Sequence, residues 1–251
     1  MSEVSPAPER EPRNGQRLVD ELLSALDLPP GRGPVVVGLT GSVCVGKSTT
    51  SELLASRLRE LGREVASITG DAFLWPNARL DEAGLSMQKG FPATYDAQTM
   101  RGSLAALRRG RAVDIPVYRH DVYDVVAGEW QSVEPAEVVV VDGLHLGRFA
   151  RSELDRLVYL EASEPVLEAW YVARFEQLVE EAGRVVAGGG APTFYAGFLP
   201  MEPQPRRELA SMLWRSINLV NLRDHISADR DLADVIVTFD EHHAVASITR
   251  T

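Results

Sequence analysis

Residues 41–48 are the part of the sequence whose types and spacing specify chemistry most clearly. They read Gly-Ser-Val-Cys-Val-Gly-Lys-Ser, the full phosphate-binding pattern, between an apolar β-branched run and a helical pattern. Glycines let backbone N–H groups turn toward phosphate oxygens, and the following helix adds its positive dipole end. Lys47 can reach the outer phosphates, and the Ser48 hydroxyl can ligate Mg²⁺. We therefore expect a nucleoside triphosphate to be bound by Gly41, Ser42, Val43, Cys44, Val45, Gly46, Lys47, Ser48 and Thr49.

Two carboxylates follow apolar runs that we interpret as strands. Asp71 comes after the predicted strand 64–69, and Asp142 comes after the predicted strand 136–141. Parallel α/β sheets place their chemistry at the carboxyl ends of strands. There Asp71 could orient or deprotonate a substrate hydroxyl, and Asp142 could hold Mg²⁺ through water. Each aspartate could also be a simple turn residue, because Gly-Asp and Asp-Gly are common turn pairs.

The elements that must position these residues alternate between strand and helix patterns. This alternation predicts a doubly wound parallel sheet flanked by helices, an α/β fold. We expect one domain, residues 14–251, after a disordered tail at residues 1–13 that is rich in Pro, Glu and Arg. Strands are expected at 35–40, 64–69, 136–141, 157–160 and 233–239, and helices at 14–28, from the loop to about 61, 96–109, 165–182 and 206–226.

Composition limits the partners and the compartment. The chain of 251 residues has a formal net charge of −10, which argues against a nucleic-acid or anionic-membrane partner. No apolar run approaches the roughly 18 residues that a membrane span needs. The single cysteine, Cys44, allows no intrachain disulfide and predicts a cytoplasmic protein. Cys44 is either a small tolerated loop residue or a thiol whose oxidation would block nucleotide binding.

Two kinds of motif are missing from the sequence. There is no Asn-Lys-x-Asp string, so the chain lacks the guanine reader of GTP-dependent switch proteins. No histidine or cysteine spacing suggests a structural zinc site. The sequence therefore argues against a GTP-dependent switch protein and against a protein with a structural zinc site.

Several further strings resemble one family, the bacterial pantothenate kinases of the phosphate-loop type. The resemblance runs from Val35 to about Val245, or about five-sixths of the chain. Beyond the phosphate loop with its double threonine, the matching strings are Gly70-Asp71-Ala72-Phe73-Leu74 with Pro76-Asn77, Lys89-Gly90-Phe91-Pro92 with Tyr95-Asp96, residues 117–125, residues 170–175, residues 213–218 with Asn221-Leu222, and His242-His243-Ala244-Val245.

This resemblance implies a P-loop kinase that uses ATP and Mg²⁺ to phosphorylate a small molecule, pantothenate, in the first step of coenzyme A biosynthesis. Asp71 would hold and activate the pantothenate hydroxyl. Arg174 would lie near the phosphates or the pocket mouth, and His243 would pack against adenine. Residues 183–205 would close over the substrate as a lid that excludes water. Further residues implied to line the substrate pocket are Tyr118, His120, Tyr123, Tyr171 and Asn218.

Other readings of the sequence stay open. Arg119 and Asp121 stand where the family has a serine and a leucine, and a different substrate is indicated if they point into the pocket. The nearest alternative is a uridine-kinase-like or specialised-metabolism kinase, although uridine kinases usually have Tyr-Asp-Phe where this chain has Tyr118-Arg119-His120. A non-catalytic nucleotide-binding regulator is the alternative of another class. A homodimer is also left open, because the family is usually dimeric but part of the region that shapes the dimer is missing.

One departure from the family predicts a change in regulation. Glu52 stands where the family has an arginine associated with binding the feedback inhibitor coenzyme A, and Leu178 replaces an aromatic residue of the inhibitor pocket. An anion in place of a cation should weaken binding of a phosphorylated inhibitor. We therefore expect weak inhibition by coenzyme A in a steady-state kinase assay. An inhibition constant as tight as that of an ordinary family member would contradict this expectation.

Overall fold

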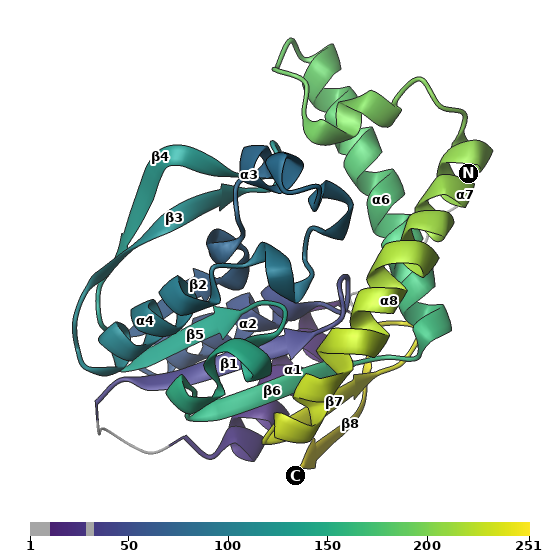
Figure 1. The fold of residues 1–251 in the computed structure, drawn as a ribbon. Helices are drawn as coiled ribbons and strands as arrows, with labels where there is room; N and C mark the ends of the chain where they lie inside the picture. Colours follow the sequence, from purple (N-terminus) through teal and green to yellow (C-terminus); the bar gives the residue numbers. More distant parts are fainter. Residues whose placement is uncertain (1–10, 29–32) are drawn as a thin grey trace.

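The computed structural model describes residues 11–28 and 33–251. Residues 1–10 of the expected tail lie outside the described residues, and helix α1 (Glu11–Leu26) begins within the remainder. The centre of the molecule is a six-stranded sheet with the order β2-β5-β1-β6-β7-β8 (Figure 1). Its strands are β1 (Val35–Gly41), β2 (Val65–Thr69), β5 (Val138–Asp142), β6 (Arg156–Glu161), β7 (Val235–Phe239) and β8 (Val245–Arg250).

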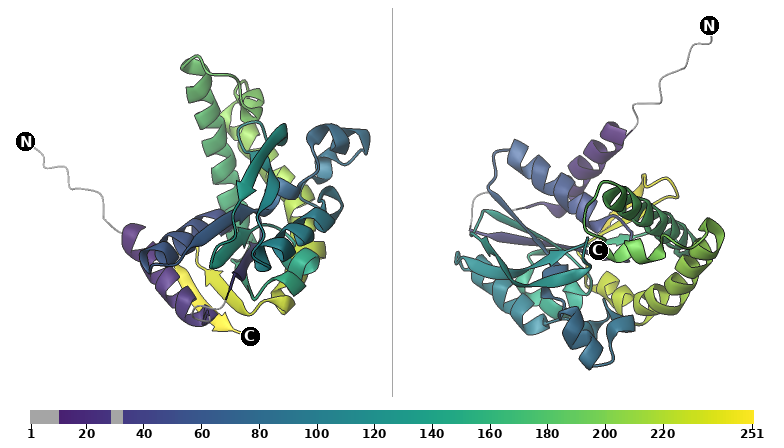
Figure 2. Two further views of the ribbon diagram at one scale, coloured as in Figure 1. Left: turned by 90° about the vertical axis from the view of Figure 1, so that its left-hand side faces the viewer. Right: turned by 90° about the horizontal axis from the view of Figure 1, so that it is seen from above.

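Neighbouring strands from β2 to β7 pair in parallel, and only the edge strand β8 is antiparallel to its neighbour. Helices cover both faces of the sheet (Figures 1 and 2), so the predicted doubly wound α/β fold is confirmed. The inner strands are buried on both faces, as the runs of valine in β1 and β5 require. The remaining helices are α2 (Lys47–Glu60), α3 (Asn77–Glu82), α4 (Ala97–Arg108), α5 (Leu146–Ala150), α6 (Glu164–Ala187), α7 (Pro203–Leu213) and α8 (Leu219–Asn221).

A two-stranded antiparallel hairpin, β3 (Val113–Arg119) with β4 (Asp124–Val133), lies apart from the main sheet. The sequence analysis did not predict this hairpin or β8, because most of β4 and β8 is exposed and neither has a clear apolar run. The hairpin packs against the turn that follows β2. It therefore brings residues 117–125 over the carboxyl end of the sheet.

Helices α6 and α7 form an antiparallel pair that projects beyond the sheet (Figure 1). Helix α6 ends at Ala187, five residues later than the sequence suggested. Gly183 lies inside this helix and does not end it. The lack of a side chain there allows close packing, because an added Cβ would lie 3.1 Å from a Leu199 methyl carbon. The irregular part of the expected lid is consequently shorter, residues 188–202, and contains one 3₁₀ turn, Phe194–Phe198.

The predicted helix 206–226 begins earlier, at Pro203, and is not a uniform α-helix. Two π-helical turns, Trp214–Asn218 and Leu222–Ile226, flank the short α8. Wider turns of this kind often occur at functional sites, because each changes which side chains face the neighbouring elements. Trp214 is fully buried in the first of them.

Asp229 joins three elements from a fully buried position. Its carboxylate accepts hydrogen bonds from the Thr40 hydroxyl at 3.1 Å and from the backbone N–H groups of Gly147 and Arg148 at 3.0 Å each. The start of α5 is thereby held beside the end of β1. Burial raises the pKa of Asp229, while these hydrogen bonds lower it.

Replacing this aspartate should destabilise the fold. We expect Asp229→Ala to lower the free energy of unfolding by about 2–4 kcal/mol, because buried N–H groups lose their acceptor. Chemical denaturation measures the change. The exposed Asp231→Ala in the same turn is the control and should change stability by less than about 0.5 kcal/mol. Equal effects of the two substitutions would show that the Asp229 hydrogen bonds do not stabilise the protein.

Candidate active site

The phosphate loop connects β1 to α2 with the backbone geometry that an anion site requires. Gly41 and Gly46 have φ angles of 141° and 95°, in a region that favours glycine. An added Cβ on Gly41 would lie 2.2 Å from the Leu160 carbonyl oxygen, so no other residue fits there. Gly46 is the N-terminal cap of α2, and no side chain occupies the first N–H groups of that helix. These free donors are where a phosphate group can bind.

Lys47 and Ser48 lie at the start of α2 and face the end of β5. The Ser48 hydroxyl donates a hydrogen bond of 2.8 Å to the Asp142 carboxylate. The Lys47 ammonium donates to the carbonyl oxygens of Gly41 and Ser42 at 3.2 and 2.8 Å. Burial lowers the pKa of Lys47, and the nearby carboxylates of Asp142 and Asp71 raise it. The hydroxyl and carboxylate oxygens of Ser48 and Asp142 are the donor types that Mg²⁺ prefers.

Asp71 lies in a 3₁₀ turn directly after β2 and beside the end of β5. In the register of these strands Thr69 pairs with Asp142, so Asp71 is only two positions beyond that pair. The two chains approach closely at Gly70 and Gly143: a Cβ on Gly70 would lie 3.0 Å from the Gly143 Cα atom. Glycine at both positions therefore lets the two carboxylates converge on the phosphate loop.

A cluster of tyrosine side chains, Tyr95, Tyr118 and Tyr123, lies next to Asp71. The cluster contains Lys89, which is absent from the site residues expected from the sequence. The Lys89 ammonium donates to the Asn77 side-chain oxygen at 2.6 Å and to the carbonyl oxygen of Tyr123. It also lies 5.3 Å from the ring centre of Tyr118 and 4.3 Å from that of Tyr123. Burial lowers the pKa of Lys89, whereas Asp124 and Asp71 raise it.

A sequence signal for Lys89 exists. Lys47 and Lys89 are the only two lysines in a chain that otherwise uses arginine for its cations. Tyr95 was also missed: it is buried, and its hydroxyl lies 3.5 Å from the Asp71 carboxylate. Both residues belong to strings that resemble the family, but their chemical neighbours became clear only in three dimensions.

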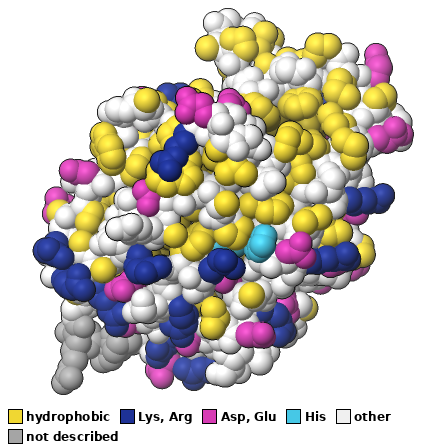
Figure 3. Space-filling model, in the orientation of Figure 1, with side chains coloured by type: hydrophobic (Ala, Val, Ile, Leu, Met, Phe, Trp, Pro, Cys, Tyr) yellow, Lys and Arg dark blue, Asp and Glu magenta, His cyan; other side chains and the backbone are white. Residues whose placement is uncertain are grey.

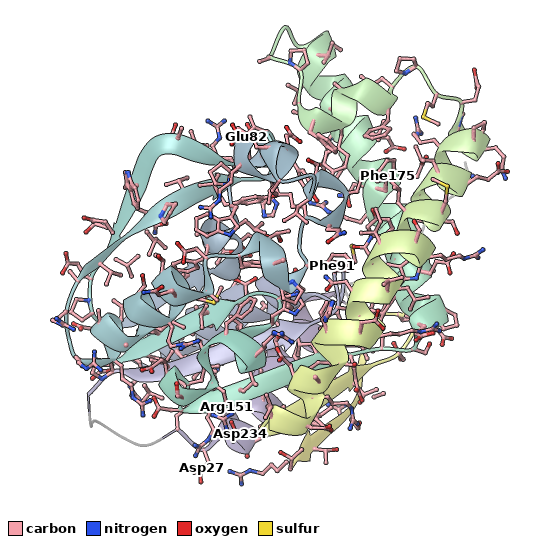
Figure 4. The ribbon with its side chains drawn as sticks, viewed as in Figure 1. Asp27, Glu82, Phe91, Arg151, Phe175 and Asp234 are labelled. Carbon is pink, nitrogen blue, oxygen red and sulfur yellow. The ribbon has the colours of Figure 1, made fainter. Side chains whose placement is uncertain are left out.

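The expected lid lies against the hairpin in the structure. The Phe194 N–H donates a 3.1 Å hydrogen bond to the Asp121 carbonyl oxygen. The Phe194 ring stacks on Tyr123 with ring centres 4.8 Å apart. On the other side, Tyr195 and Phe198 pack on Phe175 of α6, which Figure 4 labels. The 3₁₀ turn of the lid therefore bridges the hairpin and α6.

Helix α6 and the π-helical turn after α7 carry two more candidate residues, Tyr171 and Asn218. Asn218, in the first π-helical turn, lies beside the Tyr171 hydroxyl and lowers its pKa, while burial raises it more strongly. Burial likewise raises the pKa of Tyr118 and of Tyr123, so both hydroxyls stay protonated. The cluster of tyrosine side chains therefore presents neutral hydroxyl donors next to one ammonium and one carboxylate.

Arg119 and Asp121 point away from the site. Their side chains form an ion pair with each other, with an N–O distance of 2.6 Å, and about half of each side chain is exposed. The sequence alone leaves open whether Arg119 and Asp121 point toward the substrate. Their mutual ion pair and their exposure show that they do not. They give no reason to choose another substrate.

The nucleotide side is a cavity of about 960 Å³ between α1, the phosphate loop, α6 and the β7–β8 turn. Trp170 and His243 line it and stack on each other, with ring centres 3.5 Å apart, so Trp170 covers one face of the histidine. A base can therefore pack on the His243 ring only from the face opposite Trp170. The candidate residues that line the cavity are Cys44, Val45, Gly46, Lys47, Ser48, Thr49, His120, Arg174 and His243.

Cys44 lies in the loop with a left-handed backbone, at a φ angle of 61°. Burial raises the pKa of its thiol to about 11, although the charges of Lys47 and Arg174 lower it. The thiol is consequently protonated at neutral pH. This favours the interpretation of Cys44 as a tolerated loop residue over that of a reactive thiol.

Comparisons with known proteins agree with this geometry. The model of the phosphoribulokinase/uridine kinase family matches residues 36–177. The chain belongs to this family. Relatives named pantothenate kinase, from Streptococcus agalactiae serotype III (strain NEM316) and Streptococcus pneumoniae (strain P1031), are 32% and 36% identical to it. Each match covers 86% of this chain and 72% of the relative. The resemblance to pantothenate kinases is thus confirmed, and the chain is a phosphotransferase with an alcohol group as acceptor.

Solved structures share the fold. A putative fructose transport system kinase from Silicibacter sp. TM1040 superposes with a TM-score of 0.66 at 24% identity, over 85% of this chain and 94% of that one. D-glycerate 3-kinase from Cryptococcus neoformans gives a TM-score of 0.59 at 15% identity, over 94% and 99%. At these identities the likeness shows the P-loop kinase fold alone. No helix among residues 11–28 and 33–251 is long and apolar enough to cross a membrane.

The position of Lys89 leads to a testable expectation. Lys89→Met should lower kcat/KM for the acceptor by about 10- to 100-fold, because charge-assisted hydrogen bonds in a buried site are lost. ATP affinity should stay within twofold, since Lys89 lies outside the nucleotide cavity. Steady-state kinetics with each substrate varied measures both values. A loss of ATP affinity instead would place Lys89 on the nucleotide side.

Proposed function

We propose that this protein is an ATP- and Mg²⁺-dependent kinase that phosphorylates the hydroxyl of pantothenate. The observation that carries the proposal is the convergence of Lys47, Asp142 and Asp71 at one edge of the sheet, next to the cluster of tyrosine side chains and Lys89. The pantothenate kinase relatives support the substrate. The ammonium of Lys89 supports it too, because pantothenate carries a carboxylate and a nucleoside is uncharged.

Each residue would have a separate role in the reaction. Mg²⁺-ATP supplies the transferable phosphoryl group when bound. Ser48 and Asp142 would hold the metal ion, Lys47 would offset charge on the phosphoryl oxygens, and His243 would contact the base. Asp71 would orient the acceptor hydroxyl and take its proton. The acceptor would be held by Tyr118, Tyr123, Tyr171 and Asn218. His120 and Arg174 would contact the acceptor from the part of the nucleotide cavity that they line.

The lid would favour transfer over hydrolysis. Phe194 contacts both the hairpin backbone and the Tyr123 ring, so the lid and the hairpin would together cover the acceptor. Excluding water from the phosphoryl group lets the acceptor hydroxyl compete successfully as the nucleophile. Opening and closing of residues 183–205 would then admit substrate and release product.

A substrate panel tests the proposal directly. ADP release from ATP is measured with pantothenate, with nucleosides including uridine, and with small alcohols. We expect stimulation by pantothenate. Stimulation by uridine alone would favour a uridine-kinase-like enzyme, and stimulation by a small alcohol alone would favour a specialised-metabolism kinase. Stimulation by none of them would favour a nucleotide-binding regulator.

The role of Asp71 leads to a second test. Asp71→Asn keeps the size of the side chain but removes its ability to accept a proton, so turnover should fall at least 100-fold. Nucleotide affinity, measured by calorimetry, should change less than threefold because Asp71 does not line the nucleotide cavity. The neighbouring exposed Asp81→Asn serves as a control for general effects of charge. Near-wild-type turnover of Asp71→Asn would defeat the assignment.

A further inference from the structure

His145 lies in a conformation and an environment that are unusual for a histidine. It is fully buried, just before α5, and its backbone is left-handed with a φ angle of 60°. This region is sparsely used by residues other than glycine and asparagine, so the surroundings must hold His145 there. Burial lowers the pKa of its ring to about 4, and the ring is therefore neutral at physiological pH.

The Nε2 atom of His145 makes one polar contact, to the carbonyl oxygen of Gly90 at 2.8 Å. Since a carbonyl oxygen can only accept, Nε2 carries the proton and donates it. The Nδ1 atom then has no hydrogen-bond partner among the described residues. The hydrogen bond to the Gly90 carbonyl is thus the one hydrogen bond that the His145 ring makes among the described residues.

Asn221 of α8 contacts the same oxygen. Its side-chain amide donates to the Gly90 carbonyl oxygen at 2.8 Å, and the residue is 3% exposed. One carbonyl thus accepts from two buried side chains, one that follows β5 and one on α8. We refer to His145, Asn221 and the Gly90 carbonyl as the Gly90 clamp.

The segment held by this clamp carries two side chains of the acceptor pocket. Lys89 directly precedes Gly90, and Tyr95 follows five residues later. Gly90 has a φ angle of 94°, and its N–H donates to the Thr94 hydroxyl at 3.0 Å, so the segment forms a closed turn. The His145 ring also packs edge-on against Tyr95, whose hydroxyl reaches Asp71. Fixing one carbonyl therefore restrains Lys89 and Tyr95, both of which lie near Asp71.

The clamp also connects the acceptor pocket to the helices of the lid. Asn221 follows Asn218 by three residues, so both lie on the same side of the helix. Phe91, labelled in Figure 4, contacts His225 with ring centres 5.7 Å apart and adds an apolar contact across the same junction. The turn at residues 88–95 is in this way joined to α8 and to the strand end that carries Asp142.

We infer that His145 and Asn221 are positioning residues that hold the Gly90 carbonyl and thereby set Lys89 and Tyr95 in place for the acceptor. Neither residue lines the nucleotide cavity. The inference rests on the proposed function only for the identity of the acceptor. The conformation of the turn at residues 88–95 does not depend on that identity.

Two substitutions remove the two donors with little change of shape. Asn221→Leu is nearly isosteric, and His145→Asn keeps a residue that tolerates the left-handed backbone. Each leaves the Gly90 carbonyl with one donor. The matched control is His225→Phe, which keeps a ring against Phe91 and removes no bond to Gly90.

Hydrogen exchange tests the clamp independently of substrate. The backbone N–H groups of Gly90, Phe91 and Thr94 are hydrogen-bonded within the turn. We expect them to exchange at least tenfold faster in Asn221→Leu and His145→Asn, with wild-type exchange in the central strands and in the control. Wild-type exchange of residues 88–95 in both folded variants would overturn the inference. If one variant does not fold, the other decides.

Kinetics separate positioning from general stability. We expect the KM for pantothenate to rise about tenfold in both variants, while the KM for ATP stays within twofold and His225→Phe changes neither. A lower melting temperature with both KM values unchanged would assign the clamp a structural role only and overturn the inference. Absence of pantothenate turnover in the wild type would instead refute the proposed function, and hydrogen exchange would still decide on the clamp.

Discussion

The parallel pairing of β2, β5 and β1 is the constraint on which the rest of the site depends. It places three carboxyl ends side by side, so the phosphate loop, Asp142 and Asp71 face one another. Close approach of Gly70 and Gly143 completes the arrangement, because side chains there would push the strand ends apart. Without this edge, Lys47 would have no acidic neighbours and the Ser48 hydroxyl would lack its Asp142 partner.

The acceptor side of the site depends on a different kind of contact. Hairpin β3–β4, the turn at residues 88–95 and the α6–α7 pair come from three distant parts of the chain. They meet through aromatic packing and through hydrogen bonds to backbone carbonyls, such as that of Tyr123 with Lys89. Figure 3 shows hydrophobic side chains gathered over the upper part of the molecule, and Val185, Val186, Phe194 and Leu199 are exposed large hydrophobic residues of α6 and the lid region. Partly exposed apolar side chains would suit a segment that opens and closes, as proposed for the lid.

The sequence predicts the phosphate loop between β1 and α2 and the doubly wound sheet around it. A β-branched run, a glycine-rich loop and a helix are local signals, and the alternation of strands and helices predicts the doubly wound sheet. The acceptor half depends on long-range contacts that leave weak local patterns. Most of β4 is exposed, so the sequence does not predict the hairpin. Helix α6 continues past the predicted end at residue 182, and Gly183 packs against Leu199 inside it. Lys89 and His145 each donate a hydrogen bond to a carbonyl oxygen of a segment distant in sequence, and no local pattern predicts such a contact.

The most direct test of the account is a crystal structure of the protein with Mg²⁺, a non-hydrolysable ATP analogue and pantothenate. The account predicts that the hydroxyl oxygen of pantothenate lies about 2.6–3.2 Å from an Asp71 carboxylate oxygen and faces the terminal phosphate above Lys47. It further places the pantothenate carboxylate on the side of Lys89. A pantothenate hydroxyl beyond reach of Asp71, with the terminal phosphate facing another group, would contradict the account.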